Sequence, residues 1–294
     1  MDIPYATQAR CPLVVLLDVH LTGAGVVLEG LVAQAQLQQM AARGDAGAVV
    51  HLVLADLDLR NGQMDAALLP DFVAPILAGE ADYTKGNRFF DLEQIRQMPG
   101  MRLFGNAVLS FMTKLSCGYW NVMDPTNGYT AVRTCVLAEL PLDKLESRYF
   151  FETDMLFRLN TVRAVVKDVP MDSVYADEES NLKIGKVLPE FLRKHASRLW
   201  RRYVYNYLVR DFNVGTLYSL FGSLLVVVGS VFGAMHWLDS ALSNHPATSG
   251  TVMLAALPIL VGIQFLIAFL HYDVSNLPVE PLSHSLAAPQ SDES

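Results

Sequence analysis

Residues 81–131 read ADYTKGNRFFDLEQIRQMPGMRLFGNAVLSFMTKLSCGYWNVMDPTNGYTA, and the rest of the chain is organised around this stretch. A first polar cluster contains Lys85, Gly86 and Arg88, and a second one spans residues 124–130. Between them, apolar residues recur at helical spacing through residues 103–115, a segment too short to span a bilayer. Binding residues concentrate in loops held by rigid elements, so we expect two active-site loops braced by one helix.

The first cluster has the composition of a diphosphate-binding loop. Gly86 lets the backbone approach a ligand closely, and the guanidinium of Arg88 can contact two phosphate oxygens at once, with Lys85 as a second cation. An ordinary charged surface loop explains the same residues about equally well.

The flanking sequence predicts an α/β domain over residues 1–183. Residues 13–19, 48–55 and 163–171 are apolar runs typical of buried strands, and residues 28–43 and 65–77 have helical composition. A strand, a helix and a second strand in succession favour a mostly parallel sheet with crossover helices.

Oxygen-bearing side chains follow the second predicted strand, at positions Asp56, Asp58, Asn61 and Gln63. Open α/β sheets bind ligands at the carboxyl ends of their strands, and oxygen ligands suit Mg²⁺ or Mn²⁺. An isolated Asp-x-Asp is also common in solvated turns, so the pattern alone leaves both interpretations open.

Three further carboxylates are candidates for catalysis. Asp124 lies in a turn-forming loop with Asn127 and Gly128, and Asp in such a loop also caps its own backbone. Glu152 and Asp154 open a predicted helix, where acids are favoured by the helix dipole alone.

The C-terminal third predicts a membrane module. Residues 184–212 combine Arg and Lys with aromatic residues, as in amphipathic helices that lie in the headgroup layer. Two uncharged segments within residues 213–272, namely 214–238 and 251–270, are long enough to cross a bilayer. The loop between them lacks Lys and Arg, so the positive-inside rule places the α/β domain in the cytoplasm. Residues 273–294 are rich in Pro and Ser and predict a disordered tail.

From about residue 61 to the second apolar segment, the chain resembles the polyprenyl-phosphate glycosyltransferases, the dolichol-phosphate mannosyltransferase-like branch of glycosyltransferase family two. The resemblance is carried by residues 62–65 (GQMD), by Lys85, Gly86 and Arg88, and by residues 124–130. It implies a GT-A-like, Rossmann-related domain with an interfacial helix and a two-helix transmembrane hairpin.

Aligned without a gap, the metal-binding carboxylates of that family fall on Leu59 and Asn61, whereas a three-residue shift places them on Asp56 and Asp58. Residues 1–60 are atypical, because they lack the Pro-x-Tyr-Asn-Glu turn with which the family opens. The resemblance implies these roles: catalysis by Asp124, Glu152 and Asp154, donor or phosphate binding by Lys85, Gly86, Arg88, Asn127 and Gly128, and metal binding by Asp56, Asp58, Asn61 and Gln63.

The expected function is transfer of a sugar from a nucleotide-sugar donor to a polyprenyl phosphate lipid, with Mg²⁺ or Mn²⁺, by a multi-pass protein of the cytoplasmic (inner) membrane that could form a homo-oligomer. The net charge of −8 argues against nucleic acid as a partner. The alternative is a non-catalytic, membrane-bound relative or scaffold that has lost donor binding, which the missing N-terminal motifs favour.

Overall fold

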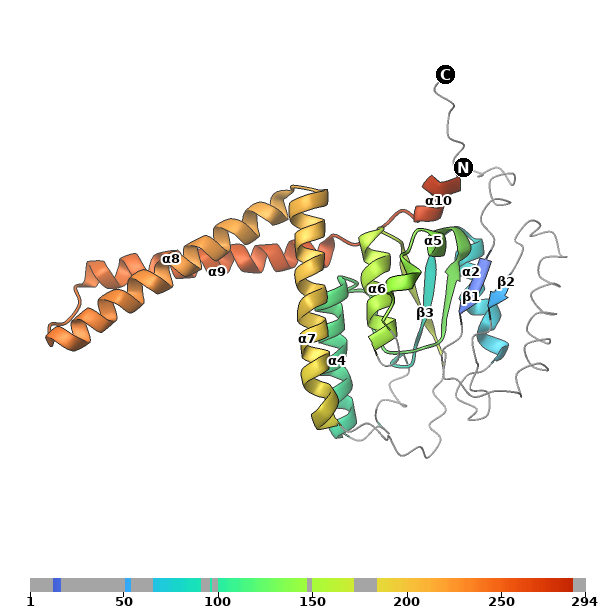
Figure 1. Cartoon of the computed structure of the whole chain (residues 1–294), viewed down its shortest axis with the longest axis horizontal. Helices are drawn as coiled ribbons and strands as arrows, with labels where there is room; N and C mark the ends of the chain where they lie inside the picture. Colours follow the sequence, from blue (N-terminus) through green and yellow to red (C-terminus); the bar gives the residue numbers. More distant parts are fainter. Residues whose placement is uncertain are drawn as a thin grey trace, which may run out of the picture. The chain divides into compact units, whose positions relative to one another are not determined.

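The computed structural model describes residues 13–16, 51–53, 66–90, 96, 100–146, 150–171 and 184–287. The chain forms two compact units: Met1–Trp200 together with Leu277–Ser294, which we name the α/β unit, and Arg201–Asn276, which we name the hairpin unit. Figure 1 shows the sheet and its helices in the first unit and a pair of long helices in the second. The two units are treated separately below.

The α/β unit contains a five-stranded sheet in the order β2-β1-β4-β3-β5. The strands are β1 (Leu13–Leu16), β2 (His51–Val53), β3 (Tyr83–Asn87), β4 (Thr130–Arg133) and β5 (Val166–Pro170). The pairs β1–β2 and β3–β5 are parallel, whereas β4 runs antiparallel to both of its neighbours. The predicted α/β class is therefore confirmed, and β1, β2 and β5 lie within the three predicted strand segments.

Two central strands, β3 and β4, were not expected from the sequence. We predicted a loop at residues 81–90, but Lys85 and Gly86 lie on β3 and only Arg88 follows its end. Lysine and glycine are poor strand formers, so local propensity favours a loop here. Pairing of β3 with β4 on one side and β5 on the other overrides that propensity.

Helices cover both faces of the sheet. On one face, the hydroxyl of Thr84 donates to the carbonyl of Phe72 in α2 (2.8 Å), and the Phe72 ring packs edge-on against Tyr129. The other face packs on α6. The described helical segments of the unit are η3 (Ala66–Leu68), α2 (Leu69–Leu77), α4 (Gly100–Cys117), α5 (Thr134–Ala138), η4 (Leu142–Lys144), α6 (Phe151–Thr161), α7 (Ile184–Tyr203, whose last three residues belong to the hairpin unit) and α10 (Leu282–Ala287).

The helices predicted at residues 65–77 and 103–115 and in the first part of 184–212 are confirmed as α2, α4 and α7. The N-cap residue of α2 is Leu68, and its side chain makes no capping hydrogen bond. The helix follows directly on the preceding 3-10 turn, and Pro70 lies in its first turn, where a missing N–H costs nothing. The helix predicted at residues 28–43 lies outside the described residues.

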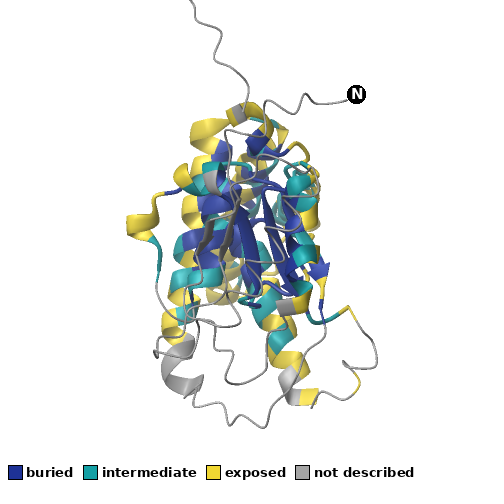
Figure 2. Ribbon diagram, turned by 90° about the vertical axis from the view of Figure 1, so that its right-hand side faces the viewer, coloured by how far each residue is buried: buried dark blue, intermediate teal, exposed yellow. Residues whose placement is uncertain are grey.

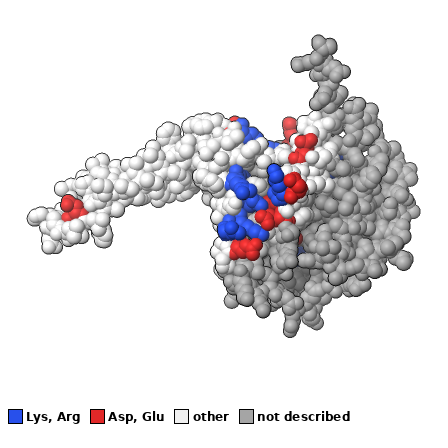
Figure 3. Space-filling model, in the orientation of Figure 1, with Lys and Arg blue, Asp and Glu red and all other residues white. Residues whose placement is uncertain are grey.

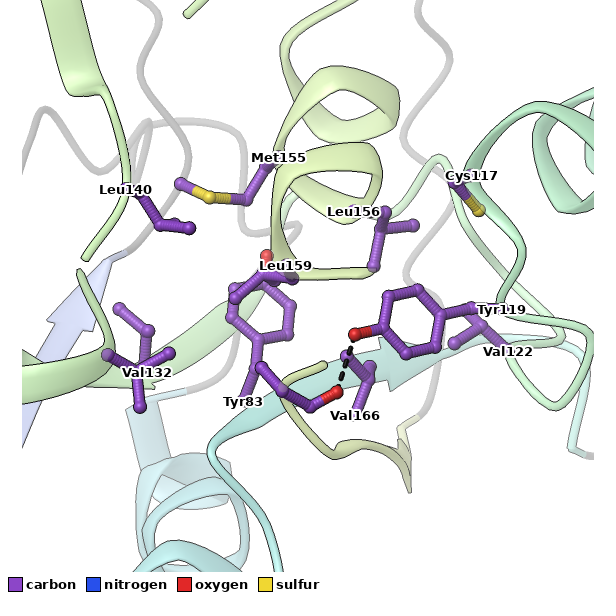
Figure 4. Packing of buried hydrophobic residues seen from close by; sticks show 12 residues of the cluster. Tyr83, Cys117, Tyr119, Val122, Val132, Leu140, Met155, Leu156, Leu159 and Val166 are labelled. Atoms are coloured by element: carbon purple, nitrogen blue, oxygen red, sulfur yellow. Dashed lines mark hydrogen bonds between the residues drawn. The ribbon is translucent and has the colours of Figure 1, made fainter. Parts of the chain in front are cut away.

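The main core lies between the sheet and α6 (Figure 4). Tyr83 and Val166, from neighbouring strands, pack against Leu156 and Leu159 of α6. The hydroxyl of Tyr119 reaches into this core and donates to the carbonyl of Ala164 at 2.5 Å, so its one polar group is satisfied. Figure 2 shows the buried residues gathered on the strands and on the helix faces turned toward them.

The hairpin unit begins with the end of α7 and a π-helical turn, η6 (Val204–Arg210), and continues into α8 (Val214–Ser243) and α9 (Ser249–Ser275). Both α8 and α9 are long and apolar enough to cross a membrane, judged by length and composition, and most of their residues are exposed. Figure 3 shows their surface almost without charged atoms. The two apolar segments predicted from the sequence are therefore confirmed as helices.

The helices α8 and α9 approach each other closely at glycines. A Cβ atom on Gly262 would lie 2.8 Å from the carbonyl oxygen of Gly222, and one on Gly229 would lie 2.9 Å from that of Ala255. Small residues at such crossings allow the backbones of apolar helices to pack directly.

One buried ion pair ties the two ends of the hairpin unit together. The guanidinium of Arg202, at the end of α7, donates to both carboxylate oxygens of Asp273 in α9 (2.6 and 3.0 Å), and the hydroxyl of Tyr207 donates to the same carboxylate (2.5 Å). Burial, together with the neighbouring Asp273, raises the pKa of Tyr207 well above its ordinary value, so the phenol stays protonated and remains a donor.

The expected disordered tail from residue 273 is wrong for residues 277–287. We name these residues the C-terminal strap, because they return to the α/β unit and pack on it. The buried carboxylate of Asp82 accepts hydrogen bonds from the backbone N–H groups of Leu282 (2.7 Å), Ser283 (2.9 Å) and Val165 (2.9 Å). Leu277 and Leu282 also pack against the main core. Composition alone did not predict this packing, because the acceptor of the strap N–H groups, Asp82, lies about 200 residues earlier in the chain.

Candidate functional site

The two polar clusters of the sequence meet at one edge of the sheet. Because β4 is antiparallel to β1 and β3, the loop that enters it lies where those parallel strands end. We name residues 123–129 the entry loop. Arg88 directly follows β3 at the same edge. Open α/β sheets place their ligands at this edge, outside the carboxyl ends of the strands.

A bidentate ion pair joins the two clusters. The Nε of Arg88 donates to Asp124 Oδ2 at 2.6 Å, and Nη2 donates to Oδ1 at 3.1 Å. The hydroxyl of Thr126 also donates to Oδ1, at 3.2 Å. The Asp124 side chain is fully buried, whereas 30% of the Arg88 side chain is exposed. Arg88 and Asp124, one from each polar cluster, are therefore in direct contact, and Arg88 presents a cation at the surface beside the carboxylate.

Lys85 and Gly86 support the entry loop from beneath. Lys85 is fully buried, and its ammonium donates to the carbonyl of Asn127. A Cβ atom on Gly86 would lie 2.7 Å from Nδ2 of Asn127 and would also overlap Met171, so a larger residue here would displace the side chains of Asn127 and Met171. The side chain of Asn127 in turn accepts the N–H of Tyr129 (2.9 Å). These contacts brace the entry loop; they do not place the Lys85 ammonium at the surface. Gly128 lies half-buried between Asn127 and Tyr129 in the same loop.

Asp168 on β5 belongs to this site and was missed by the sequence reasoning. It is the register partner of Lys85, and its Oδ2 accepts the N–H of Met123 at 2.8 Å. Burial raises its pKa to about 6, against the opposing effects of the Met123 N–H and the Lys85 charge. The available signal was a carboxylate inside the predicted strand of residues 163–171, where a buried acid needs a partner.

Glu152 and Asp154 lie in the first turn of α6, as predicted, but the contacts of Asp154 belong to a different cluster. Asp154 is fully buried: Oδ1 accepts from Arg198 of α7 (2.6 Å), and Oδ2 accepts from Arg158 and from the N–H of Glu146 (both 3.0 Å). This arrangement joins α6 to α7. Glu152 is half-buried on the same helix.

Some of the basic residues of α7 form ion pairs in the same cluster, and Figure 3 shows Lys and Arg beside Asp and Glu on this surface. Glu146 forms ion pairs with Lys194 (3.0 Å) and Arg198 (3.1 Å), and its hydrogen bond with Lys194 is the largest effect on its pKa, which lies below its ordinary value. Arg193 and Arg201 remain exposed on α7. Only part of the predicted basic face is therefore available to a membrane or a lipid.

The predicted metal ligands Asp56, Asp58, Asn61 and Gln63 lie outside the described residues. Within the residues that the structure describes, no group of three or more His, Cys, Asp or Glu side chains is placed to hold a metal ion. The carboxylate of Asp124 is paired with Arg88, so the described part of the site at the carboxyl edge of the sheet contains an ion pair. Binding of Mg²⁺ or Mn²⁺ stays a prediction from the sequence.

Comparison with known proteins does not assign the chain to a family. No model of a known protein family matches the chain. A segment of 117 residues, 40% of the chain, is 26% identical to the uncharacterized protein MJ1222 of Methanocaldococcus jannaschii. The match covers 48% of that archaeal protein, so the chain spans about half the length of the relative that it matches.

Proposed function

We propose that the protein is a membrane-anchored glycosyltransferase that moves a sugar from a nucleotide-sugar donor to a polyprenyl phosphate. The observation that supports this most is the Arg88–Asp124 pair at the carboxyl edge of the sheet, where a partly exposed cation and a buried carboxylate lie side by side. The resemblance to the polyprenyl-phosphate glycosyltransferases rests on the same residues.

In the proposed reaction, an oxygen of the acceptor phosphate attacks the anomeric carbon of the donor sugar. The bond from that carbon to the diphosphate breaks, and its electron pair leaves with the nucleoside diphosphate, so the configuration inverts. A phosphate acceptor is anionic near neutral pH and needs little deprotonation, hence positioning and electrostatics supply most of the rate. Arg88 would hold phosphate oxygens, and Asp124 would act as the base or would orient the acceptor.

A divalent cation fits this scheme at the segment containing Asp56, Asp58, Asn61 and Gln63, where it would neutralise the donor diphosphate. The sequence alone carries this assignment.

Membrane attachment is supported by three features. The helices α8 and α9 expose apolar surface along their length. The helix α4 of the α/β unit exposes Phe104 (67%) and Phe111 (55%), as a helix lying in a headgroup layer would. The strap and α7 connect both ends of the hairpin unit to the same α/β unit, so a two-pass arrangement leaves both ends on one side, which the positive-inside rule assigns to the cytoplasm.

The test uses the full chain, purified in lipid nanodiscs. It is incubated with undecaprenyl phosphate, Mn²⁺ and radiolabelled UDP- or GDP-sugars, and the label is measured in the extracted lipid. We expect label in the lipid from the wild type and at least about a hundredfold less from Asp124→Asn. The matched control is Asp143→Asn, which removes an exposed carboxylate in η4 and should leave transfer unchanged.

Transfer that continues at the wild-type rate in Asp124→Asn would refute the role of this carboxylate. The second candidate is a membrane-bound scaffold without donor binding, favoured by the atypical residues 1–60. Calorimetry with the same sugars, with and without Mn²⁺, separates the two, because the scaffold would show no saturable binding.

A further inference from the structure

Two residues of opposite charge hold the entry loop on either side of Asp124. On β5, Asp168 accepts the N–H of Met123, the residue before Asp124. On β3, Lys85 donates to the carbonyl of Asn127, three residues after Asp124. Asp124 therefore lies between two fixed points, each provided by a strand of the central sheet.

The two holding residues also face each other. Lys85 and Asp168 are register partners on adjacent parallel strands, so both side chains leave the same face of the sheet. Their neighbours two positions back, Tyr83 and Val166, both lie in the core under α6, which identifies that face. Lys85 is fully buried. A buried ammonium needs a nearby negative charge, and Asp168 supplies one.

We infer that Asp168 and Lys85 act together as positioning residues that fix the entry loop, and with it Asp124, for the reaction. The catalytic part of this inference rests on the proposed glycosyltransferase function. The loop itself is tested without any substrate, so the two can fail separately.

The first test measures backbone hydrogen exchange of the full chain in nanodiscs. In Asp168→Ala the N–H of Met123 loses its acceptor, and we expect its exchange to become about tenfold faster or more. In Asp168→Asn the side-chain oxygen can still accept this N–H, so the increase should be smaller. The matched control is Lys167→Met on the same strand, which removes an exposed ion pair with Glu80 and should leave Met123 unchanged.

The second test is a double-mutant cycle on sugar transfer, with Asp168→Asn, Lys85→Met and the combined variant. If the two residues act as a pair, each single change lowers kcat about tenfold or more while KM for the donor stays within about twofold. The combined variant should be no slower than the slower single variant. Of the three variants, the combined one is also expected to fold best, because it leaves neither the buried ammonium nor the buried carboxylate without its partner.

Unchanged exchange at Met123 in Asp168→Ala, with native exchange elsewhere, would overturn the inference. So would losses of kcat that simply multiply in the combined variant. If the wild type transfers no sugar but Met123 still exchanges faster in Asp168→Ala, the proposed function is refuted and the positioning of the loop remains supported.

Discussion

Replacing Asp82 should release the C-terminal strap from the α/β unit. Its buried carboxylate accepts the N–H groups of Leu282 and Ser283 in the strap and that of Val165 before β5. In Asp82→Ala all three donors lose their acceptor. Since the two strap donors lie at the start of α10, where no helical carbonyl is available to them, nothing on their own segment replaces it.

The size of the effect follows from the number of lost hydrogen bonds. A hydrogen bond to a charged group contributes about 1.5–3 kcal/mol. Losing the two strap bonds at the lower value costs about 3 kcal/mol, which corresponds to roughly a hundredfold change in the opening equilibrium. The packing of Leu277 and Leu282 on the core remains, so the strap should open more often without detaching permanently.

Hydrogen exchange with mass spectrometry on the full chain in nanodiscs measures this opening. We expect the exchange of residues 282–287 to accelerate about a hundredfold in Asp82→Ala and less in Asp82→Asn, which keeps one acceptor oxygen. Glu80→Ala is the matched control, since Glu80 is an exposed carboxylate two residues away, paired with Lys167 at the surface. If the α/β unit of Asp82→Ala does not fold, Ser283→Pro removes one strap donor and leaves the bond to Val165 intact. Exchange of the strap at the wild-type rate in both variants would refute the reasoning.

Three further changes test other parts of the structure. Arg88→Lys keeps the charge but loses the fork that contacts both oxygens of Asp124, so a lower melting temperature and a loss of about 1–3 kcal/mol in unfolding free energy are expected; an unchanged melting curve would contradict the pairing. Burial lowers the pKa of His195 to about 4, so between pH 6.5 and 4 the unfolded chain binds more protons than the folded one. The free energy of unfolding should therefore fall with the pH over this range, by at most about 3 kcal/mol. This loss should be smaller in His195→Phe, as denaturation followed across the same pH range would show. Gly262→Leu would place side-chain atoms against the Gly222 carbonyl and separate α8 from α9, which a longer distance between spin labels on the two helices would report; an unchanged distance would show that the close approach is not required.

The elements with strong periodicity were predictable from the sequence. The amphipathic pattern of residues 103–115 and the apolar runs at 214–238 and 251–270 appear as α4, α8 and α9, since helices of this kind are specified by local spacing and composition. The strands β1, β2 and β5 were likewise found from apolar runs. The pairing of Arg88 with Asp124 was anticipated only as the proximity of two polar clusters.

The centre of the sheet could not be predicted in this way. Lys85 and Gly86 lie on a strand because β4 and β5 pair with it, and Asp168 joins the site because β5 is in register with β3. Neither fact is encoded within a few residues of the positions concerned. The C-terminal strap is a similar case, because Asp82 and Ser283 are separated by 201 residues.

The sequence by itself determined the class of the fold, its long helices and the residue types available for chemistry, since these depend on composition and on spacing along one segment. Only the tertiary structure decided that Lys85 is buried beneath the entry loop, that Arg88 holds Asp124, and that Asp168 and Asp82 each take backbone donors from distant segments. The physical reason is that buried charges and backbone groups must find partners wherever the fold brings them, and distance along the chain does not limit where those partners come from.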